Sequence, residues 1–142
     1  MARKKNGFTR ENFETGKSNG NFIAMYHDMY DCKAWLDLTP YARDLYGFMR
    51  RKYTRKVTNG VIVESNKDNI SMPKSEYTKL YKQDTFYRAI DMLIEHGFVR
   101  VIRNGRFTRQ CNIYGFVDMW QYYGTDKFEV PNSWRRAPKK DK

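Results

Sequence analysis

The sequence predicts an α+β fold, with a core of three helices, a small antiparallel sheet and a basic β-hairpin. An amphipathic helix is expected over 84–96, because apolar residues recur there at the spacing of one helix face. These residues are Phe86, Ala89, Ile90, Leu93 and Ile94. A glycine and an arginine-rich hairpin follow this helix, and a helix with a clear start at Thr39 precedes it.

The stretch after the 84–96 helix predicts its end and the hairpin. Gly97 is expected in the left-handed conformation that ends a helix, so that Phe98 folds back on the last turn near Leu93. A strand over 99–103 follows, and Asn104-Gly105 is a strong hairpin signal. The second strand is expected over 111–116, with 103–110 as the tip.

Arginine without acid marks this hairpin. The four cations are Arg100, Arg103, Arg106 and Arg109. Like charges that face each other across a hairpin destabilise it, so we expect a compensating contact such as phosphate. A charged edge that prevents strand-to-strand aggregation is the alternative explanation.

The first long helix has a marked start. Thr39 is the expected N-cap and Pro40 suits the first helical position. One apolar face is expected, formed by Ala42, Leu45, Met49 and Tyr53. Near its C-terminal end stand Arg50, Arg51, Lys52, Arg55 and Lys56. Cations are stabilised at a helix C-terminus by the macrodipole, and contact with a DNA backbone is the alternative role.

Shorter elements fill the rest of the predicted domain. Residues 22–25 are expected as an edge strand or a segment over the core, and 27–37 as a short helix and turn. Asn59-Gly60 predicts a turn before a strand over 61–63, which would be the third strand of the sheet. A brief helix is expected over 74–80, with Tyr77 and Leu80 inward, and a helical turn over 118–123 with Trp120 against the core.

Composition and charge indicate the kind of partner. The 142 residues carry a formal net charge of +11, which favours a polyanion as the partner. We expect a flexible basic N-terminal arm over 1–20, one domain over 21–124 and a flexible basic C-terminal tail over 125–142. No apolar run approaches the ~20 residues of a membrane span, and no signal core follows the basic start, so a cytoplasmic location is expected.

Enzyme chemistry finds little support in the sequence, and we expect no catalysis, no cofactor and no metal. Cys32 and Cys111 lack the spacing of a metal or redox pair, and His27 and His96 stand far apart. Thr15-Gly16-Lys17-Ser18 resembles the end of a phosphate-binding loop, but Glu11 stands where that loop needs its first glycine. No carboxylates are spaced for a two-metal site.

Two stretches resemble a known family. The segment 84–98, DTFYRAIDMLIEHGF, resembles winged helix-turn-helix DNA-binding proteins, and 38–53, LTPYARDLYGFMRRKY, is similar to their first helix in proteins of plasmids, phages and conjugative elements. The resemblance covers roughly residues 22–117. It implies a bacterial protein that marks a DNA site for replication, conjugative transfer or transcription control. It also implies a relaxase or a replication protein, and a second copy on the DNA, as further partners.

In such proteins the start of the second helix of the motif enters the major groove. The corresponding residues are Lys82, Gln83, Thr85, Tyr87 and Arg88, with Asp84 expected as the cap. Arg100, Arg103, Arg106 and Arg109 would be the contacts of the wing. A solvated helix face is the alternative for Gln83 and Arg88. Alternatives at the level of function are an interaction module that docks an acidic protein, and an RNA binder that stacks bases on aromatic rings.

Overall fold

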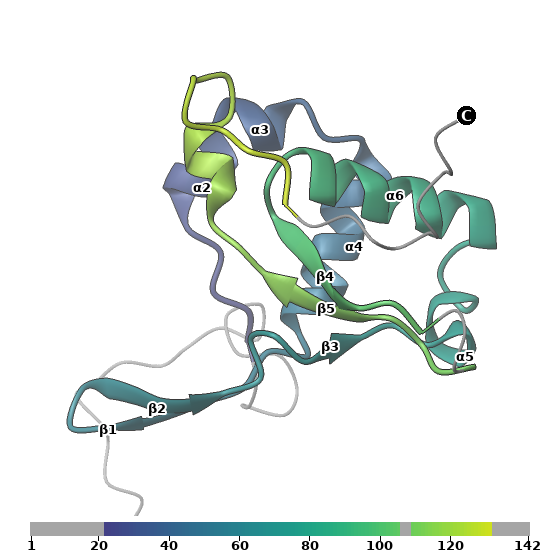
Figure 1. Cartoon of the computed structure of the whole chain (residues 1–142), viewed down its shortest axis with the longest axis horizontal. Helices are drawn as coiled ribbons and strands as arrows, with labels where there is room; N and C mark the ends of the chain where they lie inside the picture. The colour runs from purple at the N-terminus through teal and green to yellow at the C-terminus, as the bar shows by residue number, and fades with distance from the viewer. Residues whose placement is uncertain (1–21, 106–108, 132–142) are drawn as a thin grey trace, which may run out of the picture.

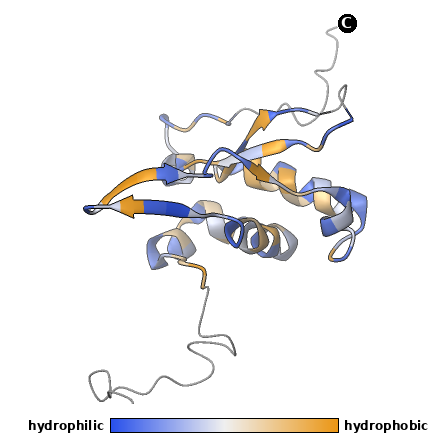
Figure 2. Ribbon diagram, turned by 90° about the horizontal axis from the view of Figure 1, so that it is seen from below, coloured by the Kyte–Doolittle hydropathy of each residue, from blue (hydrophilic) through white to orange (hydrophobic). Residues whose placement is uncertain are grey.

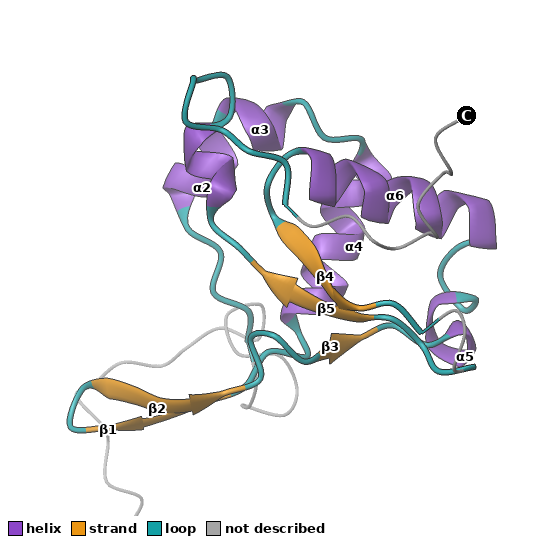
Figure 3. Ribbon diagram, viewed as in Figure 1, coloured by secondary structure: helices purple, strands orange, loops and turns teal. Residues whose placement is uncertain are grey.

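The computed structural model describes residues 22–105 and 109–131. The described elements are α2 (His27–Asp31), α3 (Lys33–Leu36), α4 (Pro40–Arg50), β1 (Arg55–Thr58), β2 (Val61–Ser65), β3 (Ile70–Ser71), α5 (Lys74–Tyr77), α6 (Gln83–Glu95), β4 (Val99–Arg103), β5 (Ile113–Phe116) and the 3₁₀ helix η1 (Met119–Tyr122). Helices lie on one side and short antiparallel strands on the other (Figures 1 and 3). This confirms the predicted α+β class.

The main sheet has three antiparallel strands in the order β3-β5-β4 (Figure 1). The central residue Tyr114 of β5 pairs with Ile70 on one side and with Val101 on the other. The register between β4 and β5 shifts after Val101, so that Arg103 pairs with Ile113. Predicted strand 99–103 is therefore confirmed, and the predicted strand 111–116 is shorter by two residues.

The predicted role of the strand over 61–63 is wrong. This segment lies in β2, which within the described residues pairs only with β1 in a separate two-stranded sheet, and β3 closes the main sheet instead. The cause is the turn between them. Asn59 and Gly60 have φ values of 52° and 77°, which is the conformation that folds a two-residue hairpin back on itself. After this turn, 61–65 runs back alongside 55–58 and pairs with it before the chain reaches the main sheet.

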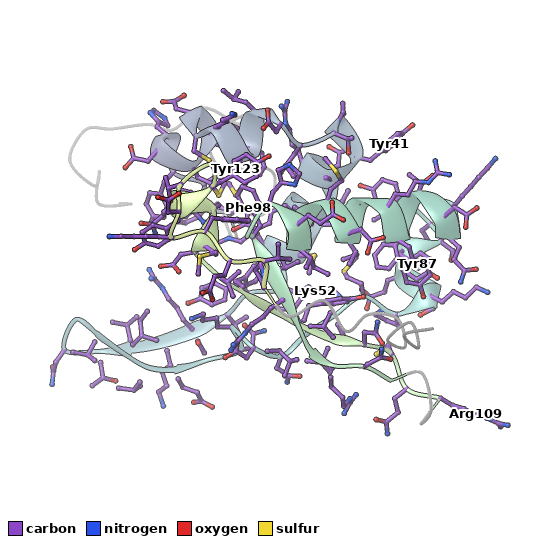
Figure 4. The ribbon with its side chains drawn as sticks, turned by 45° about the horizontal axis from the view of Figure 1, so that its top comes forward. Tyr41, Lys52, Tyr87, Phe98, Arg109 and Tyr123 are labelled. Carbon is purple, nitrogen blue, oxygen red and sulfur yellow. The ribbon has the colours of Figure 1, made fainter. Side chains whose placement is uncertain are left out.

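The core lies between α4, α6 and the inner face of the main sheet. All five predicted apolar residues of α6 are buried, and so are Ala42, Leu45 and Met49 of α4. Tyr53 is half-buried, whereas Tyr46 adds a buried ring that the sequence did not single out. Phe98 lies at the centre of the aromatic part of the core (Figure 4).

The start of α4 forms as predicted. The Thr39 side chain accepts a hydrogen bond from the Ala42 amide at 3.3 Å, and Pro40 occupies the first turn. The predicted basic cluster at its end is only partly helical, because α4 stops at Arg50 and Arg55 and Lys56 belong to β1. The Arg50 guanidinium lies 5.3 Å from the centre of the Tyr53 ring and donates to the carbonyl of Ala24. Its role in the fold is therefore to hold the N-terminal segment against the body.

The end of α6 also forms as predicted. Gly97 has a φ of 86°, and its amide donates to the carbonyl of Ile94 at 3.1 Å. The amide of Phe98 donates to the carbonyl of Leu93 at 2.9 Å. These two bonds are the Schellman arrangement, which satisfies carbonyls left free at a helix end.

Smaller elements agree in part. Residues 22–25 form no strand, although Met25 packs on the core, and Leu80 is exposed because α5 ends at Tyr77. Trp120 in η1 stacks on Phe98 with a ring separation of 6.1 Å, as expected. The predicted arm over 1–20 and residues 132–142 of the predicted tail lie outside the described residues. Within the described part, no helix is both long enough and apolar enough to cross a membrane.

Burial raises the pKa of several tyrosine hydroxyls above the usual value of 10.0. The tyrosines are Tyr46, Tyr77, Tyr81 and Tyr123. For Tyr81 the pKa rises to about 12, mainly by burial, and the nearby Asp44 carboxylate adds to the effect. A raised pKa means that the folded state holds the proton more tightly. This contribution to stability is complete below the unfolded pKa and is lost as pH rises through the folded pKa.

Tyr81→Phe is expected to leave the free energy of unfolding unchanged or to raise it by up to about 1 kcal/mol at neutral pH. The reason is that the Tyr81 hydroxyl is buried and has no hydrogen-bond partner among the residues that the structure describes. The advantage of the variant should grow above pH 10, because the wild type alone loses the contribution of this proton. Urea unfolding at both pH values checks this, with the exposed Tyr41→Phe as the control. A clear destabilisation at neutral pH would contradict it.

Candidate nucleic-acid interface

A groove of about 710 Å³ lies between α5, the start of α6 and the loop that joins β4 to β5. These three segments lie together at one end of the molecule (Figure 1). The groove is lined by Met72, Pro73, Lys74, Ser75, Tyr77, Gln83, Phe86, Tyr87, Asn104, Arg109, Gln110, Cys111, Asn112 and Tyr114. Segments more than 30 residues apart in the sequence therefore meet at one surface.

The floor of this groove is aromatic. Tyr77 of α5 stacks on Phe86 of α6 with ring centres 4.0 Å apart and planes within 2°. Tyr87 lies beside both, at 6.2 Å from Tyr77 and 5.3 Å from Phe86. Burial, and then the neighbouring Tyr87, raise the pKa of the Tyr77 hydroxyl. The stack fixes α5 against the first turns of α6, so the polar groups above it have a rigid support.

The helix residues that were predicted to contact DNA have different environments. Gln83 and Tyr87 line the groove. Lys82 and Arg88 are exposed next to it, and Thr85 is half-buried. Asp84 is not the cap that the sequence predicts. The N-cap is Lys82, whose side chain makes no capping bond, and Asp84 lies inside the first turn.

The predicted wing arginines also have different positions. Arg109 lines the groove and extends from the free end of the β4–β5 loop (Figure 4), with a φ of 57°. Arg103 is exposed, and its nearest partner is the carbonyl of Cys111 at 3.5 Å, inside the same loop. Arg106 lies outside the described residues. Of the four predicted cations, Arg109 is thus described on the loop itself, and Arg103 is described at the end of β4.

Arg100 has a different environment from Arg103 and Arg109. Val99 and Val101 point into the core, so Arg100 points from the opposite face of the sheet. There its guanidinium pairs with the Asp68 carboxylate at 3.2 Å, beside Gly115, where an added Cβ would lie 2.4 Å from the same carboxylate oxygen. The compensating charge that the hairpin needs is, for this arginine, supplied by the protein.

Asn104-Gly105 lies at the start of a wide connection, close to the tip predicted over 103–110. Arg103 pairs with Ile113, so the connection spans residues 104–112, and neither Asn104 nor Gly105 has a positive φ. The Gly105 amide donates to the Asn112 side chain at 2.9 Å, and Asn112 in turn donates to the Tyr114 hydroxyl at 3.3 Å. A side-chain amide therefore sets the path of this loop, and the loop is wider than a two-residue turn.

Sequence reasoning missed several polar residues of the groove. Lys74, Asn104, Gln110 and Asn112 contribute from α5 and from the loop. The sequence could have indicated the amide side chains of the loop, because they stand between two predicted strands of a basic hairpin. No local pattern could have indicated Lys74, since only the tertiary fold brings α5 next to the loop.

The groove and its rim are basic. Lys74, Lys82, Arg88, Arg103 and Arg109 are exposed in or around it. Glu76 forms an ion pair with Lys52, which reduces its effect on an approaching anion. Asp84 is an exposed acid in the first turn of α6, whereas Asp91 and Glu95 come beyond its first two turns. The five cations outnumber Asp84 and Glu76 at the start of the helix. An anionic ligand is therefore favoured at the start of α6 and disfavoured towards its end.

Metal ligands and the buried histidine were the remaining candidates for chemistry. Among residues 22–105 and 109–131, no group of three histidine, cysteine or acidic side chains can hold a metal ion. His96 is buried, with Nδ1 2.8 Å from the Met92 carbonyl and its ring stacked on Tyr123 at 4.9 Å. These contacts explain His96 as part of the fold.

Comparison with known proteins adds no family to these observations. No family model matches the chain, and the searches of curated proteins and of solved structures find no similar protein.

Proposed function

We propose that this protein binds double-stranded DNA in a sequence-specific manner. The start of α6 would enter the major groove, and the β4–β5 loop would contact the backbone or the adjacent minor groove. The observation that carries the proposal is the shared groove of α5, α6 and the loop, where Gln83, Tyr87 and Arg109 meet on a basic surface. The resemblance of 84–98 to winged helix-turn-helix proteins supports the same conclusion.

The order of the elements supports a winged helix-turn-helix arrangement. Helix α4, strand β3, helices α5 and α6, and the pair β4 and β5 follow one another, and β5 lies between β3 and β4 in the sheet. In this arrangement α6 is the recognition helix and the 104–112 loop is the wing. The extra hairpin β1–β2 is inserted between the first helix and the first strand.

The chemistry of the groove suits the surface of duplex DNA. A helix with side chains is about 10–12 Å across, which fits the ~12 Å major groove. Gln83 in the first turn can bond adenine with both atoms of its amide, and Arg88 one turn later can bond guanine. Lys82, Arg103 and Arg109 are suited to phosphates, which position the protein without reading sequence.

The test is the affinity for random duplex DNA measured by fluorescence anisotropy over a range of salt concentrations. We expect the triple variant Arg103→Ala/Arg106→Ala/Arg109→Ala to bind at least about tenfold more weakly, with a salt slope reduced by about 2–3. Arg100→Ala is the matched control and should change both quantities little, because Arg100 is already paired with Asp68.

Two outcomes would contradict the proposal or part of it. If the wild type does not bind duplex DNA near physiological salt, the groove is better explained as a docking site for an acidic protein. If the triple variant binds as well as the wild type, the wing does not carry the contact. The cations at the end of α4 and in β1 would then be examined first.

The biological role that we propose is the marking of a DNA site for replication, conjugative transfer or transcription control. It is supported by the resemblance of 38–53 and 84–98 to proteins of plasmids, phages and conjugative elements. Selection of preferred sites from a random pool, followed by a search for those sites next to origins or promoters, distinguishes the three roles.

A further inference from the structure

The hairpin β1–β2 projects from the body, away from the groove described above (Figure 1). Within the described residues its two strands pair only with each other, so each strand has one open edge. Every residue of both strands is exposed. The hairpin therefore contributes nothing to the core, and its sequence needs another explanation.

The hairpin is held firmly at its base. The Asn66 side chain accepts a bond from the Thr54 amide at 2.8 Å and donates to the Lys52 carbonyl at 2.7 Å. The Asn66 amide also donates to the Thr54 carbonyl at 3.2 Å. Since the Asn59-Gly60 turn fixes the other end, both ends of the hairpin are structured.

The outer half of the hairpin is apolar (Figure 2). Val57 is 47% exposed, Val61 62%, Ile62 50% and Val63 57%. Three of the four stand in succession on β2, on an open edge. Soluble proteins protect such edges with charge, proline, a β-bulge or a covering segment, because they pair readily with another strand. On β2 the register shift leaves Val63 as an extra residue opposite β1, next to the charged Glu64, whereas Val61 and Ile62 have no such protection. An exposed β-branched run of this kind suits pairing with a further strand.

We propose that β2 pairs with β2 of a second copy of this chain, antiparallel about a two-fold axis at Ile62. The register supports this. Val57 pairs with Ile62 within one hairpin, so the axis would place Val57, Ile62 and the same two residues of the second copy in one apolar row across four strands. Val61 of each copy would face Val63 of the other. The strand is therefore complementary to itself, as a two-fold interface requires.

The distribution of charged residues favours β2 over β1 as the edge that pairs with the second copy. Strand β1 carries Arg55 and Lys56, whereas β2 carries only Glu64, which lies opposite Lys56. Pairing through β1 would bring four cations onto adjacent strands. Pairing through β2 places the two β1 strands three spacings apart, about 14 Å, which exceeds the ~8 Å screening length at physiological salt. Glu64 would lie opposite Gly60 of the second copy and remain next to Lys56.

The extent of this surface predicts a weak dimer. A strand of five residues is about 17 Å long, so the pair buries less than the ~800 Å² per partner of a standard stable interface. We therefore expect a dissociation constant on the order of 10 µM. Open-ended polymers are not expected, because a two-fold pair uses the same edge of both copies.

Sedimentation velocity of the full chain over a range of concentrations tests this. The wild type should pass from monomer to dimer, and Ile62→Lys should weaken the dimer by at least about tenfold, because two cations would then face each other across the axis. Ile62 is half exposed, so the change does not disturb the core. Val130→Lys is the matched control, since Val130 is 57% exposed and lies outside the hairpin.

Disulfide trapping tests the register independently of affinity. In a background with Cys32→Ser and Cys111→Ser, Ile62→Cys should form a disulfide-linked dimer on mild oxidation. Directly opposed residues of antiparallel strands have Cα atoms about 4.5–5.5 Å apart, which lies within the Cα separation of disulfides. Arg55→Cys on the outer strand should not.

A wild type that stays monomeric over the whole range, a dimer that Ile62→Lys leaves intact, or cross-linking through residue 55 in place of 62 would each overturn the proposal. Growth beyond the dimer would also overturn it. The proposal does not depend on DNA binding, because both experiments are done without DNA.

Discussion

Phe98→Ala is expected to lower the free energy of unfolding by about 3–5 kcal/mol, a large part of the stability of a domain of this size. The Phe98 side chain is fully buried, and its ring lies 5.7 Å from that of Trp35 and 5.5 Å from that of Tyr46. Trp120 stacks on it from η1. Removing the ring would leave a cavity where α3, α4 and η1 meet, and none of these neighbours can fill it without moving a helix.

Chemical unfolding followed by circular dichroism measures this loss. Phe22→Ala is the control, because Phe22 is 85% exposed and the same chemical change there should cost little. A loss below about 1 kcal/mol for Phe98→Ala would mean that the aromatic cluster is loosely packed, against the arrangement described above.

Gly97→Ala is the second large effect, and we expect a loss of about 3 kcal/mol or more. Two causes add. Gly97 has a φ of 86°, which alanine adopts only with strain, and an added Cβ would lie 2.6 Å from the Trp120 nitrogen and 2.8 Å from the Met119 carbonyl carbon. Both of these are backbone atoms. The 3₁₀ helix η1 would have to move away from the end of α6.

Gly124→Ala separates the two causes. Gly124 has nearly the same φ, 84°, but no atom of the described part of the chain lies within 4 Å of its added Cβ. This control should therefore lose only the conformational part, about 1 kcal/mol. Thermal unfolding of both variants, compared with the wild type, gives the difference. Equal losses would show that η1 yields to the methyl group and does not clamp the end of α6.

The sequence predicted those parts of the fold whose signals are local. The apolar spacing in α6, its Gly97-Phe98 ending and the Thr39-Pro40 start of α4 each depend on residues a few positions apart, and all three are as predicted. The dipeptide Asn-Gly shows that the same local signal can precede two different connections. At 59–60 it forms a tight turn, whereas at 104–105 the Asn112 side chain, seven residues away, bonds the Gly105 amide and widens the loop.

The candidate site was predictable to a similar extent. Gln83, Tyr87 and Arg109 were expected from their place in a helix and a hairpin, and all three line the groove. The pairing of Arg100 with Asp68 and the arrival of Lys74 from α5 depend on how distant segments pack. Alternation along β4 could have indicated that Arg100 faces away from the core, but only the sheet order places Asp68 beneath it.

The Asn66 contacts at the base of the β1–β2 hairpin also bear on how the chain tolerates changes of length. The chain leaves and re-enters the body at one point, where Thr54 and Asn66 are hydrogen-bonded to each other. The eleven positions from 55 to 65 lie beyond this point, so a change in their number does not alter the packing of the body. Closing a shorter or longer excursion at such a point changes the loop entropy only slowly. This base is therefore the natural junction for trimming the chain or for grafting a peptide tag or fluorescent reporter without reworking the interior.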